Sequence, residues 1–507
     1  MASAKAPGHD RGWQLRAGPC YDPATVRMSS GTRVPAGGIP LCVDLDGTLL
    51  RTDSLVESVL LLVKGSPAAI LRLPFWLWRG KAALKDEIAR RVTLDPAALP
   101  YRGELVEFLR TEHTKGRSVL LVSAAHESIV RAVAEHLGFF DDVIATAAGT
   151  NLKGQHKRAA LVARFGAGGF DYAGDSRADL PVWEAARSAI VVGSDARLAR
   201  RAGARVERVF TSPVRRMRAI ARALRVPQWV KNFLVFVPLL MAPEVRELPL
   251  FLDAALAFAA FSACASAVYV ANDLLDLAAD RRHRSKRRRP FAAGELPLAL
   301  GLALVPACLA AGFAVAWLLL PPVFTAVLAA YLVATTAYSF RLKHVPLVDV
   351  LVLALLYTGR VIAGAAATHV RPSSWILGFS LFFFLSLAFV KRYTELYTLR
   401  DAPPELRVRG YHPTDLQLVA INGAVSGYIA VLVAALYINS DRVVGLYDRP
   451  ELLWLICPLL LYWISRVWML AFRGQLHDDP VLFAIRDRES WIVGALIAVV
   501  LLLARLL

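Results

Sequence analysis

Residues 269–297 read YVANDLLDLAADRRHRSKRRRPFAAGELP, in which an apolar helix runs into three aspartates and then into a basic segment. Asp273, Asp276 and Asp280 are spaced by three and four residues, so one helix would place all three carboxylates on one face. Charged residues at the end of a membrane helix indicate a functional site, because they are costly there. Convergent carboxylates suit Mg²⁺ that carries a diphosphate. The stretch therefore predicts a magnesium–diphosphate site at the mouth of a membrane bundle.

A dense basic run follows these aspartates, from Arg281 to Arg289. One interpretation is an anchor on the cytoplasmic side of a membrane, where positively charged loops gather. A second interpretation is phosphate binding by Lys286, Arg287 and Arg289. We expect the run to serve both purposes.

Long apolar segments surround this stretch and fill the second half of the chain. Of its 507 residues, 56% are hydrophobic, which exceeds the roughly 45–50% of soluble domains. Since a crossing takes about 20 apolar residues, nine segments predict an all-α, multi-spanning bundle; the first is short, and eight is the alternative. The segments lie at about 231–243, 250–271, 297–319, 322–340, 346–366, 374–390, 417–438, 452–472 and 489–507.

The charges between these segments predict the orientation of the bundle. The loops on one side hold 17 Lys and Arg residues, and they are 272–296, 341–345, 391–416 and 473–488. The loops on the other side contain Arg246, Arg371, Arg442 and Arg449. Because cytoplasmic loops are enriched in Lys and Arg, the basic side should face the cytoplasm of a bacterial inner membrane.

Overall charge and cysteine content exclude several classes of protein. A net charge of +18 fits loops that face anionic inner-leaflet lipids. Nucleic acid is not expected as a partner, because no stretch combines clustered cations with surface aromatic residues. The five cysteines form no CxxC pair, so we expect neither a disulfide framework nor a zinc site.

The first half of the chain reads as a soluble α/β domain. Residues 39–50, IPLCVDLDGTLL, combine four apolar residues with two aspartates and a Gly-Thr turn. This pattern predicts a buried parallel strand that ends in a loop, where open α/β sheets place their chemistry. Further strands are predicted within 117–126, 171–186 and 189–193, with helical segments between them. The alternation predicts a doubly wound sheet.

Composition divides the chain into four parts. They are a disordered lead-in at 1–37, the α/β domain at 38–210, a basic linker helix at 211–229 and the membrane bundle at 230–507. In the linker, Met217, Ile220, Ala221 and Leu224 can share a helical face. We expect this helix to lie on the anionic inner leaflet; a plain linker is the alternative.

Four short motifs occur in a set order in the α/β domain: DLDGT (44–48), a strand-ending Ser123, KGQHKRAAL (153–161) and GDSRAD (174–179). They resemble the motifs of haloacid-dehalogenase (HAD)-type phosphatases. The resemblance implies that Asp44 is the nucleophile and that Asp46 is the general acid and then the general base. It implies phosphoryl binding by Ser123 and Lys157, and Mg²⁺ ligation by Asp44, Asp46, Asp175 and Asp179. The alternative is a decayed domain that is retained as a scaffold.

The segment between the first two motifs, residues 53–100, predicts a small helical cap over this site. Its aromatic residues include Phe75, Trp76 and Trp78. They are interpreted mainly as cap core, with contact to the bilayer as the alternative, because aromatic and basic residues alternate there.

Four other motifs are spread over the membrane half: PQWVKN (227–232), NDxxDxxxDRxHxxKRxRPxAAG (272–294), YSFRLKH (338–344) and KRYTEL (391–396). They resemble the UbiA superfamily of intramembrane prenyltransferases, and within it the decaprenyl-phosphate phosphoribosyltransferases. KRYTEL stands where quinone-pathway members carry a second DxxxD motif. This departure removes a second acidic cluster and adds two cations, which favours a substrate with additional anionic groups.

The second resemblance implies transfer of phosphoribose from phosphoribosyl diphosphate (PRPP) to a polyprenyl phosphate. Asp273, Asp276 and Asp280 would hold Mg²⁺ on the leaving diphosphate. The candidate substrate-binding residues are Lys231, Asn272, Lys286, Arg287, Arg289, Tyr338, Lys343, Lys391 and Arg392. Lys343 and Lys391 have the alternative of snorkelling to the membrane surface.

Together, the two resemblances predict a bifunctional, Mg²⁺-dependent membrane enzyme. The phosphatase domain would remove the 5-phosphate from the lipid product, which would feed pentose donors such as arabinose donors for the cell envelope. One alternative is prenyl transfer to an aromatic or other small acceptor, beside a separate phosphatase. Another is a non-catalytic scaffold or transporter. A homo-oligomer remains open.

Overall fold

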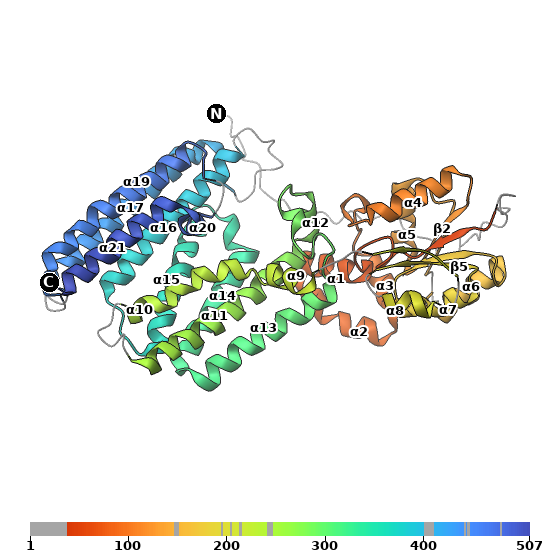
Figure 1. The fold of residues 1–507 in the computed structure, drawn as a ribbon, viewed down its shortest axis with the longest axis horizontal. Helices are drawn as coiled ribbons and strands as arrows, with labels where there is room; N and C mark the ends of the chain where they lie inside the picture. The colour runs from red at the N-terminus through yellow and green to blue at the C-terminus, as the bar shows by residue number, and fades with distance from the viewer. Residues whose placement is uncertain are drawn as a thin grey trace, which may run out of the picture.

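The computed structural model describes most of the chain, with short gaps. The described residues are 38–146, 152–193, 196–202, 205–211, 215–240, 247–399, 410–440, 443, 447–476 and 479–506. The lead-in at 1–37 lies outside them, and its disorder stays a prediction. Figure 1 shows a parallel-sheet domain at one end of the molecule and a helical bundle at the other.

The first domain is built on a six-stranded parallel sheet with the order β3-β2-β1-β4-β5-β6. The sequence predicted four strands from apolar runs, because a strand covered on both faces is hydrophobic throughout. It did not predict β3 and β6, which are less buried. The strands are β1 Leu41–Val43, β2 Val119–His126, β3 Asp142–Thr146, β4 Asp171–Gly174, β5 Ser188–Val192 and β6 Arg205–Phe210.

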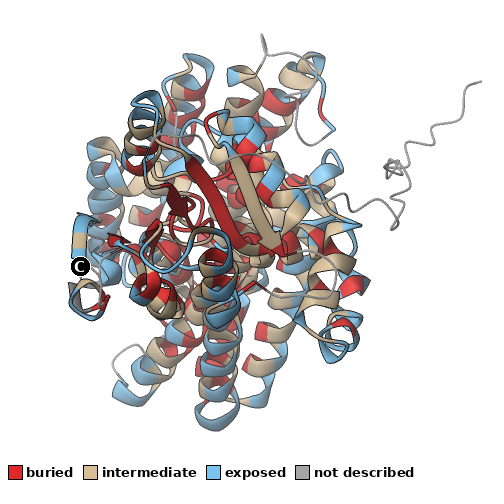
Figure 2. Cartoon of the chain, turned by 90° about the vertical axis from the view of Figure 1, so that its right-hand side faces the viewer, coloured by how far each residue is buried: buried red, intermediate tan, exposed pale blue. Residues whose placement is uncertain are grey.

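Helices cover both faces of the sheet, as a doubly wound fold requires. One face packs against α4 and α5, and the other packs against α6, α7 and α8. Figure 2 shows buried strands in red among helices whose outer surfaces are exposed. These helices are α4 Gly103–Thr114, α5 Glu127–Leu137, α6 Gln155–Phe165, α7 Leu180–Ala185 and α8 Ala196–Arg201.

A helical cap follows β1, as the sequence predicted. Trp76 packs with Leu84 and Ile88 in the cap core, whereas Phe75 and Trp78 are exposed. The interpretation as core is therefore confirmed for one of the three aromatic residues. The cap consists of α1 Ser54–Gly65, η1 Pro67–Leu71, α2 Leu73–Trp78, α3 Lys81–Ala89 and η2 Pro96–Ala98, where η marks a 3₁₀ helix.

Eight helices of the second domain are long and apolar enough to cross a membrane, counted over the described residues. The chain is thus a multi-pass membrane protein. Two of these helices are preceded by 3₁₀ turns, η8 Pro413–Asp415 and η9 Pro450–Leu455. The eight are α11 Leu248–Leu275, α13 Leu298–Leu319, α14 Pro322–Phe340, α15 Val348–Thr368, α16 Ser374–Thr398, α17 Leu416–Ile438, α19 Ile456–Phe472 and α21 Arg488–Leu506.

The first of the nine predicted segments does not form a spanning α-helix. It forms η4 (Val226–Phe236) and α10 (Val237–Leu240), where Pro227 and Pro238 lack N–H donors. Figure 1 shows this segment running beside α11 from α9 toward the end of the bundle remote from the sheet. A 3₁₀ helix rises about 2.0 Å per residue, so η4 extends about 22 Å. A short segment thus covers much of the depth of the bundle.

The basic linker forms α9 (Arg216–Ala223), which confirms a helix there. Ile220 and Leu224 pack against an apolar cluster of the two domains, whereas Met217 and Ala221 are exposed. The predicted apolar face therefore meets protein, because the neighbouring helices cover part of it. Contact with anionic lipids stays a prediction for the exposed arginines of this helix.

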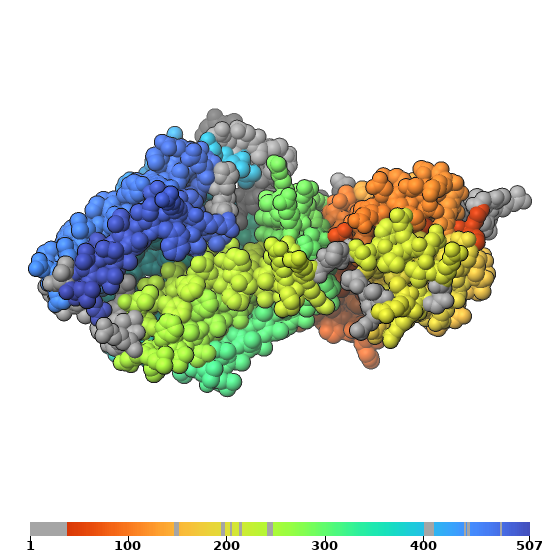
Figure 3. All heavy atoms as spheres, in the orientation of Figure 1, coloured from red at the N-terminus to blue at the C-terminus, as the bar shows by residue number. Residues whose placement is uncertain are grey.

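The two domains touch through the cap. Leu60 of α1 shares an apolar cluster with Leu274 of α11 and Leu298 of α13. In Figure 3, the green atoms at this end of the bundle lie directly against the red and orange atoms of the first domain. The cap is thus packed on the bundle as well as on the sheet.

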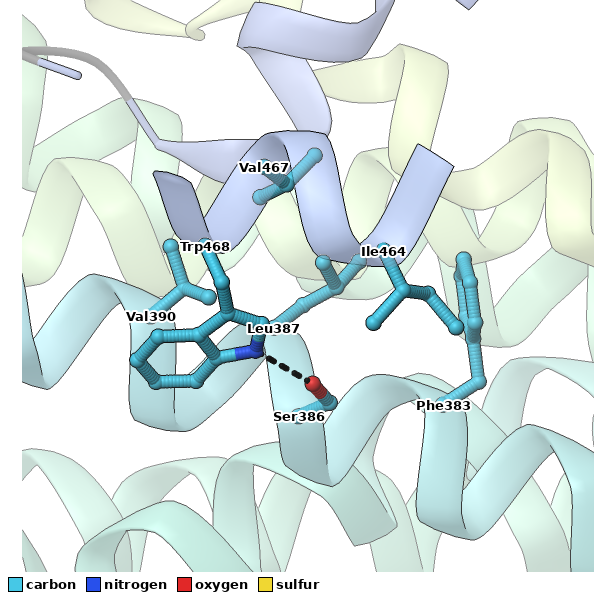
Figure 4. A pocket seen from close by; sticks show the side chains of 7 residues that line it. All are labelled: Phe383, Ser386, Leu387, Val390, Ile464, Val467 and Trp468. Atoms are coloured by element: carbon cyan, nitrogen blue, oxygen red, sulfur yellow. Dashed lines mark hydrogen bonds between the residues drawn. The ribbon is translucent and has the colours of Figure 1, made fainter. Parts of the chain in front are cut away.

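Close packing of the bundle depends on small residues where helices meet. A Cβ atom at Gly364 of α15 would lie 1.9 Å from the carbonyl oxygen of Val235. The Trp468 indole N–H donates to Ser386 Oγ at 3.1 Å in the pocket between α16 and α19, shown in Figure 4. The other side chains around this pocket are apolar, so it suits helix packing rather than an anionic ligand.

Replacing Gly364 by Ala should lower the stability of the bundle. The new methyl group would overlap a backbone oxygen that cannot rotate away, and such overpacking costs about 1–3 kcal/mol. Thermal unfolding of the purified chain in one detergent measures the change. Gly359→Ala is the control, because its methyl group on the same helix meets no atom within 4 Å; equal losses in both variants would contradict the prediction.

Candidate functional site

Three carboxylates gather at the carboxyl edge of the sheet, where the strand order reverses between β1 and β4. Asp44 follows β1, Asp175 follows β4, and Asp179 lies in the turn η3 (Arg177–Asp179). One oxygen from each carboxylate lies within 4.8 Å of the others. Doubly wound sheets bind ligands at this switch point, so the fold and the motifs indicate the same place.

Lys157 of α6 places a buried ammonium group among these carboxylates. Its Nζ lies 2.9 Å from Asp44 Oδ1 and 3.7 Å from Asp179 Oδ1. Nζ also donates to the hydroxyl of Tyr172 at 2.8 Å, and that hydroxyl donates to Asp179 at 2.9 Å. This cation balances part of the negative charge and stands where phosphoryl oxygens would need neutralisation.

Asp46 points toward the cap rather than into the carboxylate cluster. Its two oxygens accept hydrogen bonds from Ser54 N at 2.8 Å and from Ser54 Oγ at 3.0 Å. Ser54 is the first residue of α1, whose N-terminal end favours a negative charge. The sequence predicted that Asp46 is both a metal ligand and a general acid. These hydrogen bonds suit the role of general acid.

Two further residues complete this edge. Gly47 has a φ of +79°, and a Cβ atom there would lie 2.2 Å from an oxygen of Asp175, so only glycine lets the chain pass so close. Ser123 is buried near the end of β2, beside β1. Its Oγ accepts the N–H of Ala125 at 3.0 Å. The four sequence motifs therefore meet at one edge of the sheet.

Burial raises the pKa of three carboxyl groups at this edge of the sheet. Burial raises the pKa of Asp44 to about 6, although the Lys157 charge opposes the shift. Burial also raises the pKa of Asp46 to about 7, and the charges of Asp53 and Asp44 add to this effect. Burial and the charge of Asp44 raise the pKa of Asp175 to about 7. Since a divalent cation relieves this repulsion, the carboxylates of Asp44, Asp175 and Asp179 fit Mg²⁺.

In the bundle, two of the three predicted aspartates converge on one point. Asp273 of α11 and Asp280 of α12 (Leu277–Arg282) are both buried. Arg289 Nη1 lies 3.1 Å from Asp273 Oδ1 and 2.6 Å from Asp280 Oδ2, and Arg225 also pairs with Asp273. One cationic nitrogen shared by two carboxylates marks a position that suits Mg²⁺, provided that Arg289 turns to a substrate anion.

Asp276 lies apart from this pair. It separates α11 from α12, and its Oδ1 lies 2.7 Å from Nζ of Lys64, a residue of the cap of the sheet domain. The prediction that one helical face carries all three carboxylates is therefore wrong, because the helix breaks at Asp276.

A second charged cluster joins three segments of the bundle. Lys231 of η4 and Lys391 of α16 lie 2.8 and 3.2 Å from Asp479 Oδ2, just before α20 (Pro480–Arg486). Burial opposes ionisation of Asp479, but the charges of Lys391 and Lys231 outweigh it and hold the pKa of Asp479 well below its usual range. Two lysines that converge on one carboxylate oxygen form a place where an anion fits.

The remaining predicted residues are more scattered. Arg392 is buried in ion pairs with Asp349 of α15 and Glu395, an arrangement that suits helix packing more than substrate binding. Lys286 and Arg287 are exposed on η5 (Lys286–Arg288).

Three polar candidates lie at the same end of the bundle as the aspartates. Asn272 donates to Ser339 Oγ at 3.1 Å, next to Tyr338 on α14. Tyr338 is partly buried, as is Lys343 on η6 (Leu342–His344). They remain candidates for orienting a substrate.

Sequence reasoning missed three contacts of these clusters. Asp479 could have been predicted, because a carboxylate at the end of a membrane segment indicates a functional site. Arg225 was noted only as part of a basic run. Lys64 carried no signal, because its partner belongs to another domain.

Comparison with known proteins agrees with this division of the chain. The UbiA prenyltransferase family matches residues 233–504, and the haloacid dehalogenase-like hydrolase family matches residues 41–184. The uncharacterized protein y4nM of Sinorhizobium fredii is 39% identical over 467 residues, 91% of this chain and 90% of y4nM.

Two other relatives match a little over half of the chain. Nodulation protein NoeC of Azorhizobium caulinodans is 36% identical over 275 residues, 53% of this chain and 87% of NoeC. Decaprenyl-phosphate phosphoribosyltransferase of Mycobacterium tuberculosis is 32% identical over 308 residues, 58% of this chain and 99% of that relative. The chain belongs to the UbiA prenyltransferase family and carries a haloacid dehalogenase-like hydrolase domain ahead of its membrane bundle.

Proposed function

We propose that the bundle transfers 5-phosphoribose from PRPP to a polyprenyl phosphate and that the phosphatase domain then removes the 5-phosphate. The observation that carries this proposal is the presence of two cationic clusters in the bundle: Arg225 and Arg289 pair with the buried Asp273. Lys231 and Lys391 converge on Asp479. A donor with a diphosphate and a 5-phosphate, together with a lipid phosphate, requires more cations than a neutral ring. Relatives that are named decaprenyl-phosphate phosphoribosyltransferase support the same choice.

The transfer is a substitution at the anomeric carbon of the ribose. An oxygen of the lipid phosphate forms the new bond to this carbon while the bond to the diphosphate oxygen breaks. Bound Mg²⁺ would stabilise the leaving diphosphate as a Lewis acid. Asp273 and Asp280 would hold the ion, and Arg289 would turn from them to a phosphoryl oxygen. The acceptor needs no general base, since a phosphate monoester is already ionised.

The cluster of Lys231, Lys391 and Asp479 is proposed to receive the lipid phosphate. Both lysines already face one carboxylate oxygen, at 2.8 and 3.2 Å. The two lysines would turn from this carboxylate to the lipid phosphate, while Asp479 stays in place as the N-cap of α20, where it accepts the N–H of Val481 at 3.2 Å. The prenyl chain would then extend along the apolar helices, where the bilayer supplies the matching environment.

The phosphatase step uses the cluster at β1 and β4. Asp44 attacks phosphorus and forms an aspartyl-phosphate while the bond from phosphorus to the ribose 5-oxygen breaks. Asp46, whose raised pKa of about 7 keeps a proton available near neutrality, protonates that oxygen. It then takes a proton from the water that releases inorganic phosphate. The product, polyprenyl-phosphoryl ribose, would feed pentose donors for cell-envelope glycans.

Asp44→Asn should accumulate the 5-phosphorylated lipid when the purified full-length chain receives labelled PRPP, polyprenyl phosphate and Mg²⁺. Loss of the nucleophile should lower phosphatase turnover by about a thousand-fold or more, while transfer continues. Chromatography of the labelled lipids separates the two products. The wild-type chain should release pyrophosphate and phosphate in equal amounts.

Two controls make this test decisive. Asp142→Asn changes an exposed ion-paired carboxylate and should leave the products unchanged, whereas Asp273→Asn should abolish labelled lipid. Identical products from wild type and Asp44→Asn would refute the coupling of the two domains. Release of pyrophosphate from a prenyl diphosphate, and none from PRPP, would instead select prenyl transfer.

Ser54→Ala should move the alkaline limb of the phosphatase pH profile to higher pH. The Ser54 hydroxyl bonds to Asp46 and favours its ionised form, so its removal raises the pKa of Asp46. Because the general acid must start protonated, activity then persists to higher pH. The profile of kcat/KM for ribose 5-phosphate, whose alkoxide leaving group needs the proton, measures the shift. Ser58→Ala on the same helix is the control, because the Ser58 hydroxyl donates to a backbone carbonyl; it should leave the alkaline limb in place. An unchanged alkaline limb in Ser54→Ala would contradict the assignment of Asp46 as the general acid.

A further inference from the structure

The cap helix α1 reaches from one candidate site to the other. At its first residue, Ser54 holds the Asp46 carboxylate of the phosphatase. Near its other end, Lys64 lies 2.7 Å from Asp276 in the aspartate motif of the bundle. A helix of 12 residues therefore touches acidic groups of both centres.

A buried ion pair holds α1 against the bundle. Arg281 directs two guanidinium nitrogens at Glu57 of α1, at 2.6 and 2.9 Å. Both side chains are buried, and Arg281 also donates to the carbonyl oxygen of Ala292 at 2.9 Å. Separating a buried pair leaves an uncompensated charge, so this contact fixes the position of α1 relative to the aspartate motif.

The contact between Lys64 and Asp276 differs from this buried pair. The side chains are 43% and 36% exposed, which leaves the lysine ammonium in contact with solvent at the edge of the motif. A lysine on a flexible four-carbon stem binds phosphate as a mobile point charge. A diphosphate that enters beside Asp276 would therefore bring its oxygens within reach of Lys64.

We propose that Lys64, although it belongs to the phosphatase cap, is a diphosphate-binding residue of the transferase site. The proposal deepens the transferase function proposed above and rests on it for the nature of the donor. Lys64 pairs with Asp276 when the site is empty and turns to a phosphoryl oxygen of the donor when the site is filled. The cap would thus supply the transferase site with a cation from the other domain.

Lys64→Met should weaken binding of inorganic pyrophosphate, titrated calorimetrically with MgCl₂ into the full-length chain in detergent. Loss of one charge-assisted contact should raise the dissociation constant about ten-fold, and Lys64→Arg should restore most of the affinity. With PRPP, the KM should rise more than kcat falls. Turnover of p-nitrophenyl phosphate should remain, which shows that the cap is folded.

Arg282→Met is the matched control. Arg282 forms an exposed ion pair across the same domain boundary, with Asp95, but it does not contact an aspartate of the motif. This variant should bind pyrophosphate like the wild type. Wild-type affinity in Lys64→Met, with loss of binding in Asp273→Asn, would overturn the proposal. If the chain binds pyrophosphate but does not use PRPP, only the proposed donor fails.

A different observation concerns the outer face of the cap. Five large apolar side chains between residues 70 and 78 are 51–84% exposed, and they are Ile70, Leu71, Phe75, Leu77 and Trp78. Monomeric soluble proteins rarely expose so continuous an apolar patch. Arg72, Arg79 and Lys81 are exposed among and beside them.

This patch lies next to the membrane end of the bundle. It follows α1 directly in the chain, and α1 packs against α13, one of the spanning helices. Figure 1 shows α2 close to the end of α13 that faces the sheet. Apolar rings with flanking cations suit the headgroup region of an anionic leaflet. We infer that residues 70–78 dock the phosphatase cap on the bilayer.

A fluorophore at Phe75→Cys, in a background without other cysteines, should report this contact. After reconstitution of the full-length chain in vesicles of anionic lipid, brominated lipids should quench it several-fold more than a fluorophore at Glu107→Cys, an exposed position on α4. Equal, weak quenching at both positions would overturn the inference. Cross-linking between copies through Phe75→Cys, without quenching, would assign the patch to a second chain instead.

Discussion

Repulsion between neighbouring carboxylates is the constraint on which both domains depend. In the sheet domain, Asp44, Asp175 and Asp179 lie within 4.8 Å of one another, and one buried lysine offsets part of their charge. In the bundle, Arg289 bridges Asp273 and Asp280. In both domains a cationic side chain offsets part of this repulsion, and a bound divalent cation would offset it further. The two domains therefore apply the same electrostatic principle in water and at a membrane surface.

The contact between the domains holds the two carboxylate clusters in one molecule at a fixed relative position. Glu57 and Arg281 form a buried pair, and Leu60 packs with residues of two spanning helices. A product that leaves the bundle at this end would be released near the phosphatase rather than into bulk solvent. Such proximity acts as a raised effective concentration, and it requires no signal between the two centres.

Local pattern and tertiary context account for different parts of this structure. The apolar runs predicted β1, β2, β4 and β5, because buried parallel strands are hydrophobic along their whole length. β3 and β6 were missed, since partly exposed strands mix polar and apolar residues. Asp44 and Asp175 follow the apolar strands β1 and β4, as predicted, whereas Ser123 was predicted at a strand end but lies within β2, which continues to His126. The sequence did not predict that Lys64 pairs with Asp276 or that Asp479 pairs with Lys391. In each pair the two residues are far apart in the chain, and no periodic pattern connects their segments.

The packing of α1 on the bundle affects how the protein folds during synthesis. Domains at the N-terminus generally fold first during synthesis, yet Leu60 of this cap is covered by residues near 270–300. Until the ribosome has made that stretch, the nascent phosphatase exposes an apolar surface and an unpaired Glu57. Completion of the soluble domain is thus tied to insertion of the first long helices into the bilayer, and an arrest of translation before residue 300 would leave an aggregation-prone intermediate.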